Sequence, residues 1–134
     1  MNESIMKSQI RDSIRLHRAS LSDEQVKEDD KILASQFTEI GDKELKKIIS
    51  SAECVALYKS IGGELPCDGV AEFFRKNGRT VCYPKVKGEI IEFFEVKNPD
   101  SDFTIGAYGI LEPKDSCRKI YPEEISLMIV PAVA

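Results

Sequence analysis

The 134-residue sequence has an ordinary globular composition, with 31% charged and 42% hydrophobic residues. We expect one domain over residues 1–134, because a chain of this length buries about two-thirds of its unfolded surface around a single core. The net charge of -4 argues against a general nucleic-acid binder, which needs a surplus of lysine and arginine. No apolar stretch approaches the ~18 residues of a membrane span, and the charged N-terminus does not look like a signal peptide, so we predict no membrane partner and a cytoplasmic location.

Helical patterns occupy the N-terminal third of the chain. The apolar residues Ile5, Ile10 and Ile14 predict a first helix that runs through about residue 17. Ser22 and the glutamine three residues later form a capping-box pattern, which predicts a second helix starting there and ending near Gly41. A short third helix is expected around residues 45–49.

The pattern changes to alternating strand and helix after residue 53. The apolar run 54–58 predicts a buried strand, and the Gly62-Gly63 pair predicts a tight turn. Aromatic and aliphatic residues at helical spacing predict a helix over 66–76, and the run 80–83 predicts a second strand closed by Pro84. A strand, a helix and a strand in this order predict a parallel pair with a right-handed crossover, and therefore an α/β fold.

The C-terminal part is less regular. Residues 89–96 alternate loosely and predict a strand, whereas two glycines and a proline in the stretch 104–113 favour an irregular segment. The apolar run 125–130 predicts a last, buried strand. In open α/β sheets ligands gather on the loops after such strands, so the loop after this one is where chemistry is expected.

Two basic residues near the N-terminus have the spacing of a phosphate clamp. Lys7 and Arg11 lie one helical turn apart on one face, where each can supply charge-assisted hydrogen bonds to a polyphosphate. A solvated basic face is the alternative, and on spacing alone it is favoured.

Glu64 follows the first predicted core strand, at the point that faces the ligand crevice of an α/β sheet. A carboxylate there can accept a hydrogen bond from a substrate amine or move a proton. The alternative is an exposed glutamate in a turn that precedes a helix, where the helix dipole favours negative charge. The sequence does not separate these two interpretations.

Two further segments have residues suited to a pocket. Gly109 and Glu112 belong to a Gly-Ile-Leu-Glu-Pro run that either lines a pocket or forms a surface turn. Tyr83 either stacks on a planar ligand or packs in the core, and Lys85 either meets an anion or points into solvent.

The cysteines and the one histidine do not suggest a metal centre or a histidine-based mechanism. The four cysteines are widely separated and form no C-x-x-C pair, so we expect reduced thiols and no metal site. Cys67 follows the Gly-Gly pair and is the one thiol for which exposure is an open alternative to packing. His17 has polar, helical neighbours and is interpreted as a surface residue.

Taken in order, these landmarks resemble the 5-formyltetrahydrofolate cyclo-ligase family, also called methenyltetrahydrofolate synthetase. The resemblance covers essentially the whole chain with consistent spacing. Its landmarks are Lys7, Ile10, Arg11 and Arg18; Tyr58; Gly63-Glu64-Leu65; residues 78–86 (GRTVCYPKV); residues 109–113 (GILEP); and residues 127–131 (LMIVP).

The resemblance implies a three-layer, open and mostly parallel sheet flanked by helices, and an enzyme that depends on ATP and Mg²⁺. In the implied reaction the formyl oxygen of 5-formyltetrahydrofolate is phosphorylated, a folate nitrogen closes the ring, and 5,10-methenyltetrahydrofolate, ADP and phosphate are formed. Lys7 and Arg11 inherit contacts to the nucleotide. Glu64 inherits a contact to the folate near the reacting group, and Lys59 falls near the same ligand.

The sequence also departs from the family pattern. Pro66 and Cys67 stand where an acidic residue and a threonine are common, and Ser126 stands where an aspartate is usual. The family's later Arg-Leu-Gly segment and glycine-rich Tyr-Tyr-Asp loop, which cradle phosphates and bring a metal-ligating carboxylate, do not occur in these residues. We therefore expect impaired catalysis, and either self-association through uncovered apolar surface or marginal stability. A non-catalytic folate-binding remnant is the alternative; a sugar-phosphate isomerase-like protein is a more distant one.

Overall fold

The structure is a computed structural model that describes residues 2–61, 64–106 and 109–131. The predicted Gly62-Gly63 turn and the end of the chain at Ala134 lie outside these residues. The elements follow in the order α1 (Glu3–Ala19), α2 (Asp23–Thr38), α3 (Lys43–Ser51), β1 (Cys54–Ala56), α4 (Asp68–Lys76), β2 (Thr80–Lys87), β3 (Ile90–Glu95), β4 (Phe103–Ile105), β5 (Leu111–Pro113), β6 (Lys119–Ile120), the 3-10 helix η2 (Pro122–Glu124) and β7 (Leu127–Met128).

The first three helices each begin at a polar side chain that accepts a hydrogen bond from a free backbone N–H of the first turn. Asn2, Ser22 and Asp42 supply these caps, with donor–acceptor distances of 2.9, 3.1 and 3.0 Å. The predicted helix start at Ser22 is confirmed. Only half of the predicted capping box forms, because the Gln25 side chain donates to Asp29 instead.

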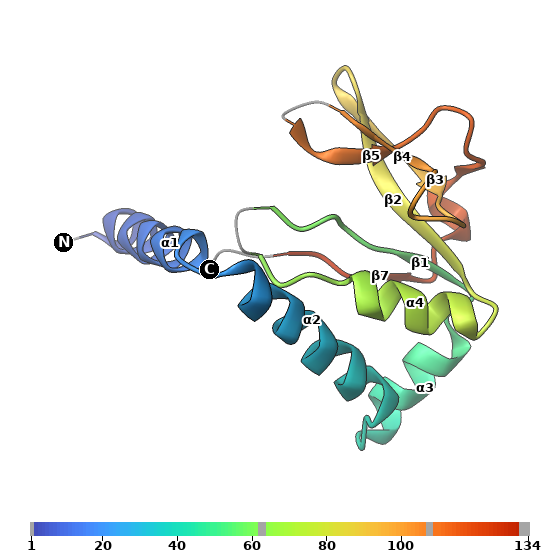
Figure 1. The fold of residues 1–134 in the computed structure, drawn as a ribbon, viewed down its shortest axis with the longest axis horizontal. Coiled ribbons are helices and arrows are strands. Elements are labelled where there is room, and N and C mark those ends of the chain that lie inside the picture. Colours follow the sequence, from blue (N-terminus) through green and yellow to red (C-terminus); the bar gives the residue numbers. More distant parts are fainter. Residues whose placement is uncertain (1, 62–63, 107–108, 132–134) are drawn as a thin grey trace.

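The two N-terminal helices differ in how they meet the rest of the chain. Helix α2 lies against α4, whereas α1 has no buried residue and extends away from the sheet (Figure 1). No helix in the described part of the chain is long and apolar enough to cross a membrane.

The central sheet has the strand order β6-β3-β2-β1-β7. Strand β1 runs parallel to β2 and β7, and β3 runs antiparallel to β2 and β6. The predicted βαβ unit is β1, α4 and β2, with Val55 opposite Val81 in the parallel ladder. The predicted α/β class, an open sheet flanked by helices, is confirmed.

Side chains from β1 and β2 alternate between two faces of the sheet. Val55 and Val81 face the helices and belong to the main core, which Phe74 of α4, Leu33 of α2 and Ile49 of α3 complete. A smaller cluster on the opposite face contains Cys54, Ala56, Cys82 and Ile120, with Phe93 and Ile125 packed against it. This period of two is what a sheet with both faces covered requires.

Strand β2 does not end at Pro84 as predicted but continues to Lys87, paired with β3. Proline lacks the backbone N–H that a ladder needs. The β1–β2 ladder ends with Leu57 N donating to Cys82 O at 2.9 Å, so β1 has already diverged where the missing N–H of Pro84 would point. The prediction was wrong because β1, with three residues against eight in β2, ends before it reaches Pro84, so the missing N–H of this proline costs no ladder hydrogen bond.

The stretch predicted to be irregular, 104–113, contributes instead to an antiparallel pair. Strands β4 and β5 are joined so that Thr104 lies opposite Glu112. Gly109 has a positive φ of 71° in the connection, and the N–H of Gly106 donates to Ile110 O at 2.8 Å. The glycines that suggested irregularity are therefore the turn residues of this pair.

The last predicted strand is shorter and less buried than expected. Strand β7 covers only Leu127–Met128, and its side chains alternate: Leu127 and Ile129 pack against the main core, while Met128 and Val130 are 48% and 68% exposed. Among the described residues β7 pairs on one edge only, with β1. The apolar run 125–130 was therefore predicted to be more buried than it is: only one face of this strand packs against the core.

Helices α2 and α4 approach each other so closely at Gly69 that the substitution Gly69→Ala is predicted to destabilise the fold. A Cβ atom at Gly69 would lie 2.8 Å from Cβ of Ala34 and 3.3 Å from Oδ1 of Asp30, which accepts from Gly69 N at 2.9 Å. We expect a loss of about 1–3 kcal/mol in the free energy of unfolding, measured by urea denaturation. Gly41→Ala is the matched control, since nothing lies within 4 Å of its Cβ position; an equal loss in both variants would contradict the close-packing argument.

Candidate functional site

A crevice opens where the chain leaves the carboxyl ends of β1 and β7, the end of an α/β sheet at which ligands bind. Its volume is about 280 Å³, and we call it the Glu64 crevice. It combines apolar walls with one carboxylate, one guanidinium and one phenol, which is the usual make-up of a small-molecule site. Its lining residues are Arg18, Leu33, Phe37, Tyr58, Glu64, Leu65, Ile129, Val130 and Pro131.

Glu64 is held in the crevice by its own turn. The N–H of Ile61 donates to Oε1 of Glu64 at 3.0 Å, and the N–H of Glu64 donates to Ile61 O at 3.0 Å. One carboxylate oxygen is thereby fixed to the backbone, and the half-buried side chain is oriented before any ligand binds. The residue that precedes Glu64 in the family landmark, Gly63, lies outside the described residues.

Tyr58 forms the part of the crevice next to β1. Its hydroxyl donates to the carbonyl oxygen of Leu65, and burial, followed by the nearby Cys67 and Glu64, raises its pKa to about 12. Arg18, at the end of α1, acts in the opposite direction on that pKa. At neutral pH the phenol is therefore a neutral hydrogen-bond donor.

Next to Tyr58, Lys59 forms a second polar group at the end of β1. Its ammonium lies 3.1 Å from Oδ1 of Asp68, at the start of α4, and 4.9 Å from the centre of the Phe103 ring. Only 19% of the Lys59 side chain is exposed. A cation held between a carboxylate and an aromatic face has a defined position. Sequence reasoning did not single out Asp68 or Phe103; the acidic first residue of a helix was the available signal for the former.

Tyr83 supports this cluster from below. It is fully buried, and its ring meets that of Phe103 edge-on at 4.9 Å and 76°. Burial raises the pKa of its hydroxyl. The structure thus favours the core-packing interpretation of Tyr83. Its ring contacts the Phe103 ring, over which the Lys59 ammonium lies.

Lys85 meets an anion, as one of its two interpretations suggested, but this anion is a carboxylate of the chain itself. Its ammonium donates to Pro113 O at 2.9 Å and pairs with Asp115 at 2.9 Å, and its side chain is 12% exposed. Lys87 pairs with the same carboxylate at 2.6 Å. The two lysines therefore attach the segment after β5 to β2.

Glu112 and Gly109 lie on the β4–β5 pair. Glu112 is 5% exposed, so the surface-turn interpretation of this residue is wrong, whereas Gly109 is exposed in the connecting turn. The Glu112 side chain occupies the space that a side chain at position 106 would need. A Cβ atom at Gly106 would lie 2.3 Å from the carboxyl carbon of Glu112. Glycine at position 106 is thus a condition for burying this carboxylate.

Lys7 and Arg11 lie outside the Glu64 crevice. Both are exposed on α1, where Lys7 pairs with Glu3 at 2.7 Å. A separate hollow lies over the first turns of this helix and is lined by Asn2, Glu3, Ser4, Lys7 and Arg11. Arg18, on the same helix, is the α1 residue that lines the crevice.

The residues that depart from the family pattern have structural roles. Cys67 is fully buried, and its thiol donates to Tyr58 O at 3.0 Å, while burial raises its pKa to about 11. Of the two alternatives for the Cys67 thiol, packing in the core is therefore correct and exposure is not. Ser126 joins β7 to β1, since its hydroxyl donates to Cys54 O at 3.0 Å and accepts from Cys54 N at 3.2 Å.

Comparison with known proteins decides the family. The sequence model of the 5-formyltetrahydrofolate cyclo-ligase family matches residues 3–134. The chain belongs to this family. A search of curated proteins found no match. Cyclo-ligase family members are enzymes, and the resemblance expected from the ordered landmarks is confirmed.

Two solved structures of cyclo-ligase relatives resemble the fold. The NMR structure of Aquifex aeolicus 5,10-methenyltetrahydrofolate synthetase is 30% identical, with a TM-score of 0.72, over 96% of this chain and 62% of that one. A 5,10-methenyltetrahydrofolate synthetase from Mycoplasma pneumoniae is 22% identical, with a TM-score of 0.61, over 93% and 63%. The chain thus spans less than two-thirds of the length of these relatives.

The attachment by Lys85 and Lys87 predicts an acid-dependent loss of stability through Asp115. Hydrogen bonds from Lys87 and then Lys85, with their charges, lower the pKa of Asp115 from 3.8 to about 2. Because the folded pKa lies below the unfolded one, this stabilisation is complete above about pH 4 and disappears as the pH falls toward 2. Urea denaturation should therefore show a stability difference between the parent and Asp115→Asn at neutral pH that vanishes at pH 2. A difference independent of pH would contradict the pairing.

Proposed function

We propose that this cyclo-ligase chain takes part in the ATP-dependent conversion of 5-formyltetrahydrofolate to 5,10-methenyltetrahydrofolate, with release of ADP and phosphate. The observation that carries the proposal is the Glu64 crevice, in which a backbone-oriented carboxylate, Tyr58 and Arg18 converge at the ends of β1 and β7. Family membership supplies the reaction class, and the crevice supplies groups that suit a reduced folate and a phosphorylated intermediate.

The proposed role of Glu64 follows from the proton that ring closure releases. After the formyl oxygen takes the phosphoryl group, the folate nitrogen N10 adds to the formyl carbon and loses its proton, and phosphate leaves with the oxygen. Glu64 accepts the N10 proton through the carboxylate oxygen not used by Ile61. Tyr58, which lines the crevice, holds the folate through its hydroxyl group, and Lys59, the next residue along the chain, does so through its charge.

A cationic stripe on α1 gives the proposed nucleotide a path into the crevice. Lys7, Arg11 and Arg18 lie within about 40° of one another around the helix axis and extend over about 16 Å. Arg18 lines the crevice, and Lys7 and Arg11 lie on the exposed part of the same helix. A nucleoside triphosphate laid along this stripe has its terminal phosphate at Arg18, next to the folate. Positioning and charge neutralisation of this kind are the main means of catalysing phosphoryl transfer.

The reaction class implies Mg²⁺, but the described residues do not form a site for it. Residues 2–61, 64–106 and 109–131 contain no group of three histidine, cysteine, aspartate or glutamate residues that could hold a metal ion. We therefore assign no metal ligand and derive no step through the ion. Phosphate oxygens of the nucleotide are the ligands that Mg²⁺ ordinarily takes in such reactions.

Two measurements separate the enzyme from a non-catalytic folate-binding alternative. Isothermal titration with 5-formyltetrahydrofolate reports binding, and the absorbance of the methenyl product with ATP and Mg²⁺ reports turnover. Binding together with turnover supports the proposal, and binding without turnover favours the non-catalytic alternative. Absence of folate binding would overturn both.

Replacing the proposed base should separate turnover from binding. Glu64→Gln retains an oxygen that accepts from Ile61 N but cannot take a proton, so we expect methenyl formation to fall about 100-fold or more, with a much smaller change in folate affinity. Glu44→Gln, at an exposed position of α3, is the control. Equal rates for Glu64→Gln and the parent would remove Glu64 from the proposed chemistry.

Neutralising the stripe on α1 should weaken nucleotide binding selectively. We expect Lys7→Gln with Arg11→Gln to lower ATP affinity by at least about tenfold and to flatten its dependence on salt, because two charge-assisted contacts are lost. The pair Lys27→Gln with Lys31→Gln has the same spacing on exposed positions of α2 and serves as the control. If both double variants bind ATP alike in a titration experiment, the assignment of Lys7 and Arg11 is wrong.

A further inference from the structure

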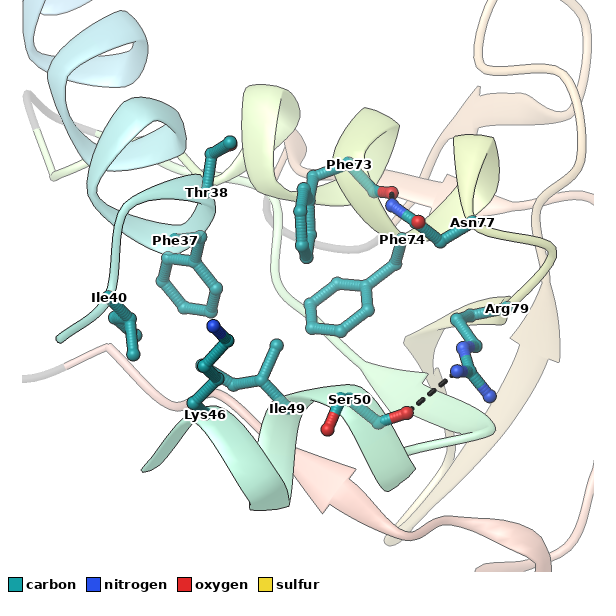
Figure 2. A pocket seen from close by; sticks show the side chains of 10 residues that line it. All are labelled: Phe37, Thr38, Ile40, Lys46, Ile49, Ser50, Phe73, Phe74, Asn77 and Arg79. Carbon is teal, nitrogen blue, oxygen red and sulfur yellow. Dashed lines mark hydrogen bonds between the residues drawn. The ribbon is translucent and has the colours of Figure 1, made fainter. Parts of the chain in front are cut away.

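A second cavity lies between α2, α3 and α4 and shares one lining residue, Phe37, with the Glu64 crevice. Its volume is about 170 Å³, and we call it the helix pocket (Figure 2). It sits beside the residues that precede β1 and β2, away from the carboxyl ends where substrates are expected. Its lining residues are Phe37, Thr38, Ile40, Lys46, Ile49, Ser50, Phe73, Phe74, Asn77 and Arg79.

The floor of the helix pocket is aromatic. Phe37, Phe73 and Phe74 pack edge to face with one another, with ring-centre distances of 5.3 to 6.4 Å. Ile40 and Ile49 complete the apolar wall. An apolar cavity of about 150 Å³ is known to stay dry and accept a benzene molecule, so this one has room for a single six-membered ring.

The rim of the helix pocket is cationic. Figure 2 shows the Lys46 side chain reaching from α3 toward the phenylalanine rings, and Arg79 on the other side donating through Nη2 to Ser50 O at 2.7 Å. A guanidinium has five N–H donors, and that bond uses one of them. No residue among those that line the pocket is acidic. An apolar slot with cations at its mouth complements a ligand with an apolar ring and a carboxylate.

We propose that the helix pocket binds a small aromatic monocarboxylate, with its ring against Phe37, Phe73 and Phe74 and its carboxylate at Lys46 on the rim. The site is independent of the folate and nucleotide chemistry proposed above, because no residue assigned there lines it. One side chain belongs to both cavities: Phe37 lines the helix pocket and the Glu64 crevice. A ring bound in the helix pocket therefore acts on the wall of the crevice through Phe37.

The test is an NMR titration of the chain with benzoate in the absence of folate and nucleotide. We expect saturable shifts of the Ile40 and Ile49 methyl signals with a dissociation constant on the order of 1 mM, as is usual for a ligand of this size. Smaller shifts are expected at Leu33, which lies beyond Phe37 in the Glu64 crevice. Absence of saturable shifts at Ile40 and Ile49 would overturn the proposal.

Charge variants test the assigned chemistry. Lys46→Gln, at an exposed position, should weaken benzoate binding about tenfold, since a contact to a charged group is lost. It should leave binding of benzyl alcohol, which has the same ring without a charge, unchanged. Lys47→Gln, the next residue of α3 and absent from the lining, is the control. Equal benzoate affinity in the two variants, or equal affinity of the parent for benzoate and benzyl alcohol, would contradict the anionic site.

Discussion

The covering of β1 on all sides determines where the candidate site lies. This strand has only three residues, but both its edges are paired, with β2 and β7, and all three residues are buried. A shift of register by one residue would move Val55 out of the helix-facing core and Cys54 into it, so the register is strongly specified. The chain therefore leaves the sheet at one defined point, and Tyr58 and Lys59 emerge there.

The same constraint sets the opposite wall of the Glu64 crevice. Ser126 is bonded to Cys54 through both its hydroxyl and its N–H, and Ile129 N donates to Ala56 O at 3.0 Å. These bonds fix the register of β7 against β1. Ile129 and Val130, which follow β7, therefore reach the crevice at a defined position. A serine at this position, where the family usually has an aspartate, thus acts on the site through strand pairing, and it is not among the residues that line the crevice.

Features that depend on neighbours along the chain were predictable from the sequence. The helix start at Ser22, the βαβ unit and the location of Glu64 after β1 all follow from spacing and turn residues. Features that depend on pairing between distant segments were not. The extension of β2 through Pro84 depends on the length of β1, and the burial of Glu112 depends on the missing side chain of Gly106, neither of which is visible in local pattern. Lys7 and Arg11 were predicted as a pair, but α1 buries nothing, so no core contact brings them to the crevice.

Helices α2 and α4 connect the two ends of the sheet and explain how its two cavities are related. Asp68 at the start of α4 pairs with Lys59 beside the crevice, and Phe74 near its end forms the floor of the helix pocket. Gly69 holds this helix against α2 at a distance that leaves no room for a methyl group. Phe37 of α2 lines both cavities, so a ligand that displaces this ring also changes the wall of the Glu64 crevice. The coupling between the two cavities thus depends on one aromatic ring that shares the crevice lining with Tyr58 and Glu64.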